Sequence, residues 1–166
     1  MPALRSLFFP LLFLFFVVPA PQSAVDWLTV FLQHQSAAAA APLFRLARIP
    51  VLHQDTVLLI PGLSIEVAKE CSSIRSSTIL LVITVVLAQL FLNDVGRKVI
   101  LVALAIPVSI AKNAARIFVI STLGTKVNPG YLHGNLHRHG GVLFLLLGLA
   151  MVVALLLLIR LTERPE

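Results

Sequence analysis

The sequence predicts an all-α transmembrane protein with about four membrane-spanning helices, an interfacial helix and a small β-hairpin-like segment. Of its 166 residues, 58% are hydrophobic and only 12% are charged, whereas ordinary soluble domains carry about 25% charged residues. The apolar residues gather in long runs, as membrane helices require. One polar, strand-like stretch at residues 50–67 interrupts them. We therefore expect residues 1–166 to form a single integral membrane domain.

The first predicted span covers residues 4–20. This run is short for a bilayer core, which takes about 20 residues, although about 17 suffice. A cleaved signal peptide is the alternative, with Arg5 as its basic start and small residues near Ser23 and Ala24 at the cleavage region. The many phenylalanines and the prolines around residue 20 favour the span.

A surface helix is predicted at about residues 24–48. Ser23 followed by Asp26 forms a weak N-terminal capping signal. Because proline disrupts a helix interior, we expect the regular helix to end at Pro42. Polar residues interrupt its apolar pattern, which favours a position on the membrane surface over a second true span; they are Asp26, Gln33, His34 and Gln35.

The strand-like segment consists of three short runs, at residues 51–53, 56–60 and 63–67. Turn residues separate them, and the last run alternates apolar and polar side chains. Unpaired strand edges are not tolerated in hydrocarbon, so this segment must lie outside the bilayer core.

Three further spans are predicted at residues 72–92, 99–123 and 142–160, with a polar turn and a loop rich in histidine and glycine between them. The positive-inside rule places the more basic side in the cytoplasm. Five basic residues fall on that side: Arg5, Arg97, Lys98, Arg160 and Arg164. Three fall on the other: Arg45, Arg48 and Lys69. We expect a multi-pass protein of the cell (inner) membrane, with the strand segment and the histidine loop on the extracytoplasmic side.

Topology brings three reactive residue types to one membrane face. Cys71, the only cysteine, immediately precedes a span that enters the membrane. Arg116 lies seventeen residues into the span that returns, about 25 Å along a helix. A histidine group precedes the last span: His133, His137 and His139. Cysteine, arginine and histidine therefore meet at one face whichever way the protein is oriented.

These residue types suit acyl transfer at a peptide bond. A cysteine attacks as thiolate, which a helix N-terminus and nearby cations favour. A histidine takes the thiol proton and returns it to a leaving amine, and an arginine stabilises the oxyanion. The plainer alternatives are that Cys71 is a small buried apolar residue and that Arg116 pairs with a carboxylate or extends to the interface.

Arg75 and the histidine group offer further candidate sites. Arg75 shares a helical face with Cys71, so it either binds a substrate carboxylate or pairs with Glu66 or Glu70. His133 and His137 have metal-ligand spacing, and His139 or Cys71 offers a third ligand. The neighbouring glycines and the lack of a His-Glu-x-x-His motif argue against a metal. We expect no metal and no other cofactor. We also expect no nucleic acid, because the basic residues that give the net charge of +6 are scattered along the chain.

Three segments resemble the exosortase/archaeosortase family. They are CSSIRS at residues 71–76, Ile106-Pro107 leading to NAARI at residues 113–117, and HRHGG at residues 137–141. The approach to the cysteine at residues 62–67 is also similar, and the resemblance extends from about residue 10 to residue 160. Such proteins are multi-span membrane enzymes with a proposed Cys, Arg and His triad on the extracytoplasmic face.

The resemblance implies a membrane cysteine peptidase or transpeptidase. Family members are thought to recognise a C-terminal sorting tag (PEP-CTERM-like) of short motif, membrane helix and basic tail. They would cleave it and transfer the new carboxyl end to an acceptor on the outer face. Carried over, Cys71 is the nucleophile, Arg116 stabilises the transition state, and His137, four residues before Gly141, is the general base. Arg75 and Asn113 are the candidates for substrate binding.

The sequence also departs from the family pattern. Many relatives have glycine where Ser73 stands and an aromatic residue where Val142 stands. Relatives commonly carry further N-terminal spans, so this chain resembles their C-terminal half, as a compact variant, a truncated product or half of a split system. The alternative function is a non-catalytic membrane assembly or carrier subunit that binds an anionic partner through Arg75, Lys112 and Arg116.

Overall fold

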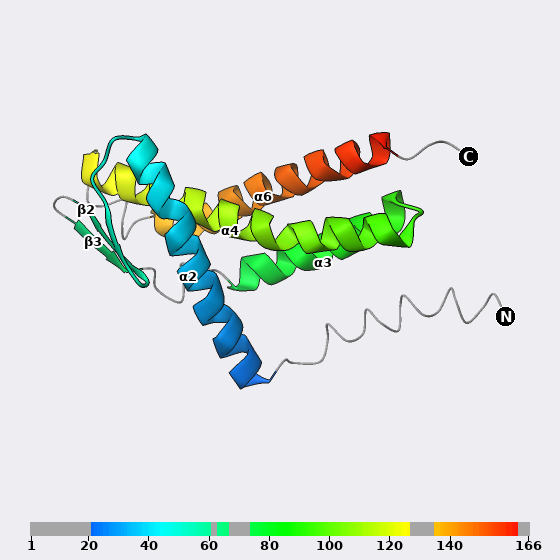
Figure 1. The fold of residues 1–166 in the computed structure, drawn as a ribbon, viewed down its shortest axis with the longest axis horizontal. Helices are drawn as coiled ribbons and strands as arrows, with labels where there is room; N and C mark the ends of the chain where they lie inside the picture. The colour runs from blue at the N-terminus through cyan, green and yellow to red at the C-terminus, as the bar shows by residue number, and fades with distance from the viewer. Residues whose placement is uncertain (1–20, 61–62, 67–73, 127–134, 163–166) are drawn as a thin grey trace.

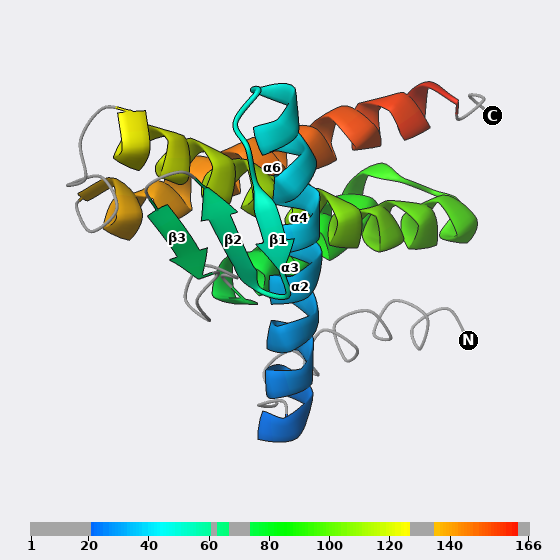
Figure 2. The same cartoon turned by 60° about the vertical axis from the view of Figure 1, so that its left-hand side comes forward.

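A helical bundle with a small sheet at one end makes up the fold in the computed structural model (Figure 1). The structure describes residues 21–60, 63–66, 74–126 and 135–162. Their helices are α2 (Gln22–Leu46), α3 (Ile74–Phe91), α4 (Val95–Lys126) and α6 (Asn135–Leu161). Their strands are β1 (Leu52–Gln54), β2 (Val57–Ile60) and β3 (Leu63–Glu66). The helices α3, α4 and α6 run side by side, and α2 crosses α4 (Figures 1 and 2).

Two described helices are long and apolar enough to cross a membrane. They comprise Val95–Thr125 in α4 and Gly141–Leu161 in α6. The apolar part of α3, Arg75–Phe91, is shorter, because the helix begins only at Ile74 and ends before the turn into α4. The predicted span at residues 4–20 lies outside the described residues. The described part therefore holds fewer full-length spans than the four that the sequence predicted.

Helix ends differ from the prediction in three places. The predicted polar turn at residues 93–98 is shorter, because Asp94 caps α4: the backbone N–H of Arg97 donates to Asp94 Oδ2 at 3.0 Å. Helix α6 begins at Asn135, inside the predicted loop, so glycines near residue 140 do not prevent helix formation. Pro42 lies inside α2 rather than ending it.

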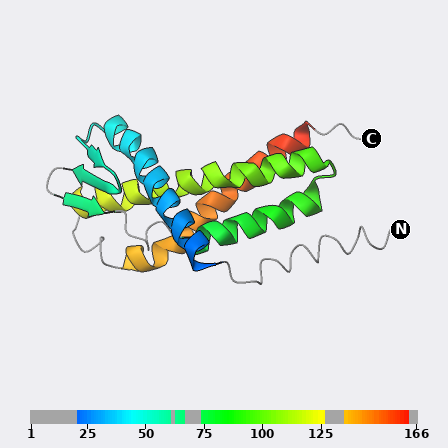
Figure 3. The same ribbon diagram turned by 60° about the horizontal axis from the view of Figure 1, so that its bottom comes forward.

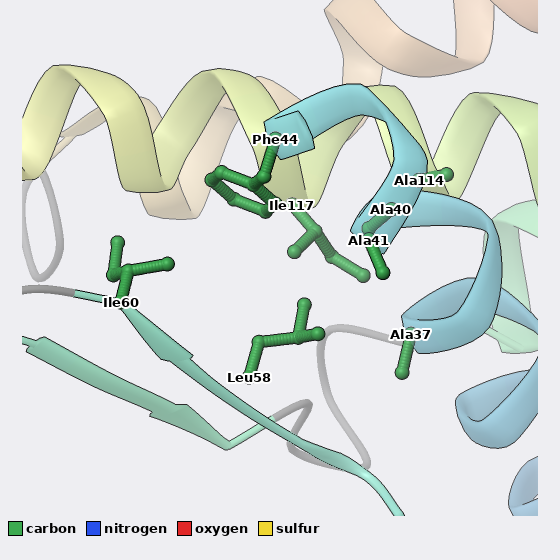
Figure 4. Packing of buried hydrophobic residues seen from close by; sticks show 8 residues of the cluster. All are labelled: Ala37, Ala40, Ala41, Phe44, Leu58, Ile60, Ala114 and Ile117. Atoms are coloured by element: carbon green, nitrogen blue, oxygen red, sulfur yellow. The ribbon is translucent and has the colours of Figure 1, made fainter. Parts of the chain in front are cut away.

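The continuation of α2 past Pro42 has a packing cause. Phe44 is fully buried and meets Phe118 of α4 edge to face, with ring centroids 5.1 Å apart. Alanines of α2 let its backbone approach α4 closely. Figure 4 shows this cluster, which consists of Ala37, Ala40, Ala41, Phe44, Leu58, Ile60, Ala114 and Ile117. Burial of the last turn thus outweighs the cost of a proline in the helix.

The sheet is antiparallel with the order β1-β2-β3, one strand more than a hairpin. Leu58 and Ile60 of β2 are buried in the α2–α4 cluster, whereas Leu59 between them is exposed, the alternation of a half-buried strand. Asp55, in the β1–β2 turn, has a φ of 57°, which aspartate tolerates better than most residues. Its carboxylate lies 2.9 Å from His34 Nδ1 and so joins the sheet to α2.

Basic residues gather at the opposite end of the bundle. Arg97 Nη2 donates to the backbone oxygen of Thr162 at 2.9 Å, which joins the start of α4 to the end of α6. Lys98 Nζ donates to Gln89 Oε1 at 2.9 Å, and the Arg160 guanidinium lies 6.0 Å from the ring centre of Phe91. The bundle therefore has a basic end and, opposite to it, an end that carries the sheet (Figure 3).

Candidate functional site

The candidate residues differ in how far the structure describes them. Arg75 of α3 is exposed, whereas Asn113 and Arg116 of α4 are 1% and 8% exposed. Cys71 and His133 lie outside the described residues. Positions 137 and 139 belong to the first turns of α6, where only the backbone is described.

A line of three polar residues follows α4 along one face: Ser109, Lys112 and Arg116, which we term the polar seam. Their i, i+3, i+7 spacing puts them on one side of the helix. Ser109 is 4% exposed and Lys112 only 1%. The seam meets the first turn of α3, because Ser109 Oγ donates to Ser77 Oγ at 2.6 Å. Beside it, Lys112 Nζ donates to Ser76 Oγ at 2.5 Å.

Three helices meet at Lys112. Gly148 of α6 lies directly against its alkyl chain, since a Cβ built on this glycine would be 3.0 Å from Lys112 Cδ and 3.2 Å from Leu80 Cδ2 of α3. A larger residue at position 148 would displace the lysine or the leucine. The glycine therefore provides the space through which the lysine extends from α4 to Ser76.

These contacts fix how far the helices are shifted along one another. Along the antiparallel pair α3–α4, the contacts of Ser76 with Lys112 and of Ser77 with Ser109 set the register. Arg116 lies one turn beyond Lys112, about 6 Å closer to the sheet end. Its level on α4 thus lies beyond that of Ser76, toward the end of the bundle at which α3 begins at Ile74.

Helix α6 has an equally definite register. Gly148 lies beside Lys112, and Thr162 accepts a hydrogen bond from Arg97, so α6 runs antiparallel to α4. Phe144 is 6% exposed and belongs to the bundle-facing side of α6. Seven residues make about two helical turns, so position 137 falls on the same face as Phe144, whereas position 139 falls on the opposite face.

The family model described as transmembrane exosortase matches residues 1–155. The chain belongs to this family. No curated protein matches it, and no solved structure does. Exosortases are generally cysteine transpeptidases that act on exported proteins in a membrane. The family match confirms the resemblance predicted from the sequence, and with the two apolar helices it identifies a membrane protein.

Two cations of α4 lie inside a helix long enough to span the membrane of this exosortase. Lys112 and Arg116 both lie within the span Val95–Thr125 and are buried one turn apart. Ionisable groups inside a span are expensive, and like charges at i, i+4 repel. Such residues are retained for a function more often than for stability.

Sequence reasoning identified Lys112 and Arg116 but missed Ser76, Ser77 and Ser109. The i, i+3, i+7 spacing on α4 was the available signal, although it does not tell which helix the polar face meets. Among the described residues, no three His, Cys, Asp or Glu side chains are grouped as metal ligands.

Proposed function

We propose that this exosortase is a membrane cysteine peptidase or transpeptidase that processes C-terminal sorting signals of exported proteins. Cys71 is the nucleophile, Arg116 stabilises the oxyanion and His137 is the general base. The observation that carries this proposal is the register of the polar seam. It joins α4 to the first turn of α3, so Arg116, one turn beyond Lys112, lies toward the end of the bundle at which α3 begins.

Chain length supports the pairing of Cys71 with Arg116. Cys71 is three residues before Ile74, so it lies within about 10 Å of the start of α3 even if fully extended. Arg116 is seven residues from Ser109, on the side of α4 that bonds to α3.

Helical position supports His137 over His139. Position 137 follows the bundle-facing side of α6, on which Phe144 is buried, and position 139 falls on the opposite side. A general base must be within hydrogen-bond distance of the thiol or one water away from it. A residue on the bundle-facing side satisfies this condition more readily.

The reaction then proceeds by two acyl transfers. His137 takes the proton of the Cys71 thiol, and the thiolate attacks the carbonyl carbon of the substrate peptide bond. The guanidinium of Arg116 stabilises the oxyanion that forms. The C–N bond breaks, His137 gives its proton to the leaving amine, and a thioester to Cys71 remains. Water or an acceptor amine attacks this thioester and restores the thiol.

The proposed topology places the active site on the extracytoplasmic side of the inner membrane. The basic end of the bundle, with Arg97, Lys98 and Arg160, then faces the cytoplasm, in agreement with the positive-inside rule. Residues 4–20 and α3 complete a set of four spans. Helix α2, which crosses the bundle and exposes Trp27 and Phe31 stacked on one another, lies at the membrane surface.

The proposal is tested by measuring cleavage of a tagged substrate protein in membranes that contain the chain or its variants. Cys71→Ala should reduce the rate at least about a thousandfold, since the nucleophile is lost. Arg116→Ala should reduce it about 100- to 1,000-fold, as loss of an oxyanion-stabilising group does. The control Lys98→Ala, a cation at the basic end, should retain the wild-type rate.

The buried cations favour one other function, that of a non-catalytic assembly or carrier subunit. In that case Arg75, Lys112 and Arg116 hold an anionic partner. Arg116→Ala would then abolish function while Cys71→Ala would not. Unchanged processing in Cys71→Ala would therefore reject the peptidase in favour of the carrier.

A further inference from the structure

Lys112 is the most enclosed charged side chain in the part of the chain that the structure describes. It is 1% exposed in the middle of an apolar bundle, where a charged group costs several kcal/mol by most measures. The proposed reaction uses Cys71, Arg116 and His137, and so leaves this lysine without a role. Its contacts, by contrast, are specific: Ser76 at its ammonium and Gly148 against its alkyl chain.

We propose that Lys112 is a positioning residue: it fixes the register of α3 against α4, and with it the start of the helix that follows Cys71. The proposal rests on the proposed function for its catalytic consequence. Its structural part is that Lys112 fixes the start of α3 against α4. This part holds or fails independently of the reaction.

The location of the acceptor is the first argument. Ser76 is the third residue of α3 and lies five residues after Cys71. A hydrogen bond at this place restrains the end of the helix from which the nucleophile segment leaves. Bonds to charged donors stabilise by about 1.5–3 kcal/mol, more than neutral ones do. The Lys112–Ser76 bond therefore restrains the start of α3 against α4 more strongly than the neutral Ser109–Ser77 bond does.

The space at Gly148 is the second argument. The lysine reaches Ser76 only because the glycine of α6 has no side chain in its path. An apolar residue at position 112 would have filled this volume at a much lower desolvation cost. The chain instead has a glycine and a lysine that fit together, and this arrangement links the registers of three helices.

Without the ammonium, the neutral Ser109–Ser77 bond still joins the two helices. The bundle should therefore fold, but α3 can shift along α4. A shift of one residue is about 1.5 Å, and a displacement of about 1 Å at reacting atoms costs about 100-fold in rate. Lys112 should therefore control the position of the reacting atoms and not the affinity for the substrate.

The experiment uses the full chain in detergent or lipid nanodiscs, with the variants Lys112→Met and Ser76→Ala. Methionine keeps much of the length of lysine but cannot donate a hydrogen bond. The matched control is Lys98→Met, the same substitution at a half-buried lysine of the basic end, whose bond to Gln89 lies at the other end of α3 from Ser76. Each variant is assayed for kcat and KM on a tagged substrate and for thermal unfolding. Each is also assayed for the alkylation rate of Cys71, which is the only thiol.

Lys112→Met should lower kcat about 100-fold with KM close to that of the wild type. Ser76→Ala should lower kcat in the same direction but less. Both should change the alkylation rate of Cys71, and Lys98→Met should change neither quantity. Because Ser76→Ala removes only one hydroxyl, it decides the question if Lys112→Met does not fold.

Wild-type kcat and a wild-type alkylation rate in a folded Lys112→Met, or in Ser76→Ala, would overturn the proposal. The two proposals fail separately. If Cys71→Ala still processes substrate, the peptidase is rejected, and the alkylation rates alone then decide whether Lys112 positions the segment that holds Cys71.

Discussion

Arg75 and Asn113, the two residues proposed to bind substrate, lie in opposite surroundings. Arg75 is exposed at the start of α3, whereas Asn113 is 1% exposed inside the bundle. An exposed cation is available to a substrate carboxylate with little rearrangement. For Asn113 we predict instead a role in packing beside the polar seam, because its side chain is buried.

Substitution should separate these two roles. Arg75→Ala should raise the KM for a tagged substrate and change the free energy of unfolding by no more than about 0.5 kcal/mol, as exposed positions do. Asn113→Ala should lower that free energy by about 1–3 kcal/mol, because buried polar partners lose a hydrogen bond. Steady-state kinetics measures the KM, and denaturant titration measures the free energy of unfolding. An unchanged KM in Arg75→Ala would remove it from the substrate site.

At this scale the sequence predicts reactive residues but not their contacts. It predicts from topology alone that Cys71 and Arg116 lie at one membrane face. The partner of Lys112 did not follow, since a serine at position 76 gives no signal of its own. Which helix faces the polar seam depends on how α3, α4 and α6 pack. The spacing of residues along α4 does not contain that information.

At the scale of helices, the contact of α4 with α6 depends on a glycine. Gly148→Ala should lower the free energy of unfolding by about 1–3 kcal/mol, as overpacking does, because the new methyl group meets Lys112 Cδ at 3.0 Å and Leu80 Cδ2 at 3.2 Å. In a Lys112→Ala background the first contact is absent, so the substitution should cost less, with a coupling of about 0.5–3 kcal/mol.

Gly141 provides the control for this cycle. It lies in the same helix, but a Cβ added there meets no atom within 4 Å. Gly141→Ala should therefore preserve or slightly raise stability, since alanine favours a helix by about 1 kcal/mol over glycine. Equal costs at positions 141 and 148, or no coupling with Lys112, would contradict the packing described for Gly148.

Helix ends show where local sequence signals were outweighed. Pro42 predicted an end for α2, but Phe44 is buried against α4 and keeps the last turn helical. The glycines near residue 140 predicted a loop, yet α6 begins at Asn135. For α2, tertiary packing decides the structure, and such packing is not visible in a short window of sequence.

At the scale of the whole molecule, the two ends of the bundle have different compositions. One end gathers Arg97, Lys98 and Arg160, and the other carries the sheet and the end of α4 beyond Arg116. The sequence predicted this division from the charges beside each span. It did not predict how α2 crosses α4, because the alanine-rich face of α2 fits more than one partner.

The proposed orientation is testable with the single native cysteine. A membrane-impermeant maleimide should label Cys71 in intact cells. Thr162→Cys, placed in a Cys71→Ala background at the exposed end of α6, should be labelled only after permeabilisation. The reverse pattern would place the sheet end of the bundle in the cytoplasm and would exclude exported proteins as substrates.

The central claim is that Cys71 forms a covalent thioester with its substrate. Mass spectrometry of the chain, quenched in acid during turnover of a tagged protein, measures this directly. We predict an adduct on Cys71 that hydroxylamine releases and that accumulates when the acceptor is withheld. It should be absent in Cys71→Ala. Substrate cleavage at the wild-type rate by Cys71→Ala, with no adduct on the wild-type chain, would contradict the account.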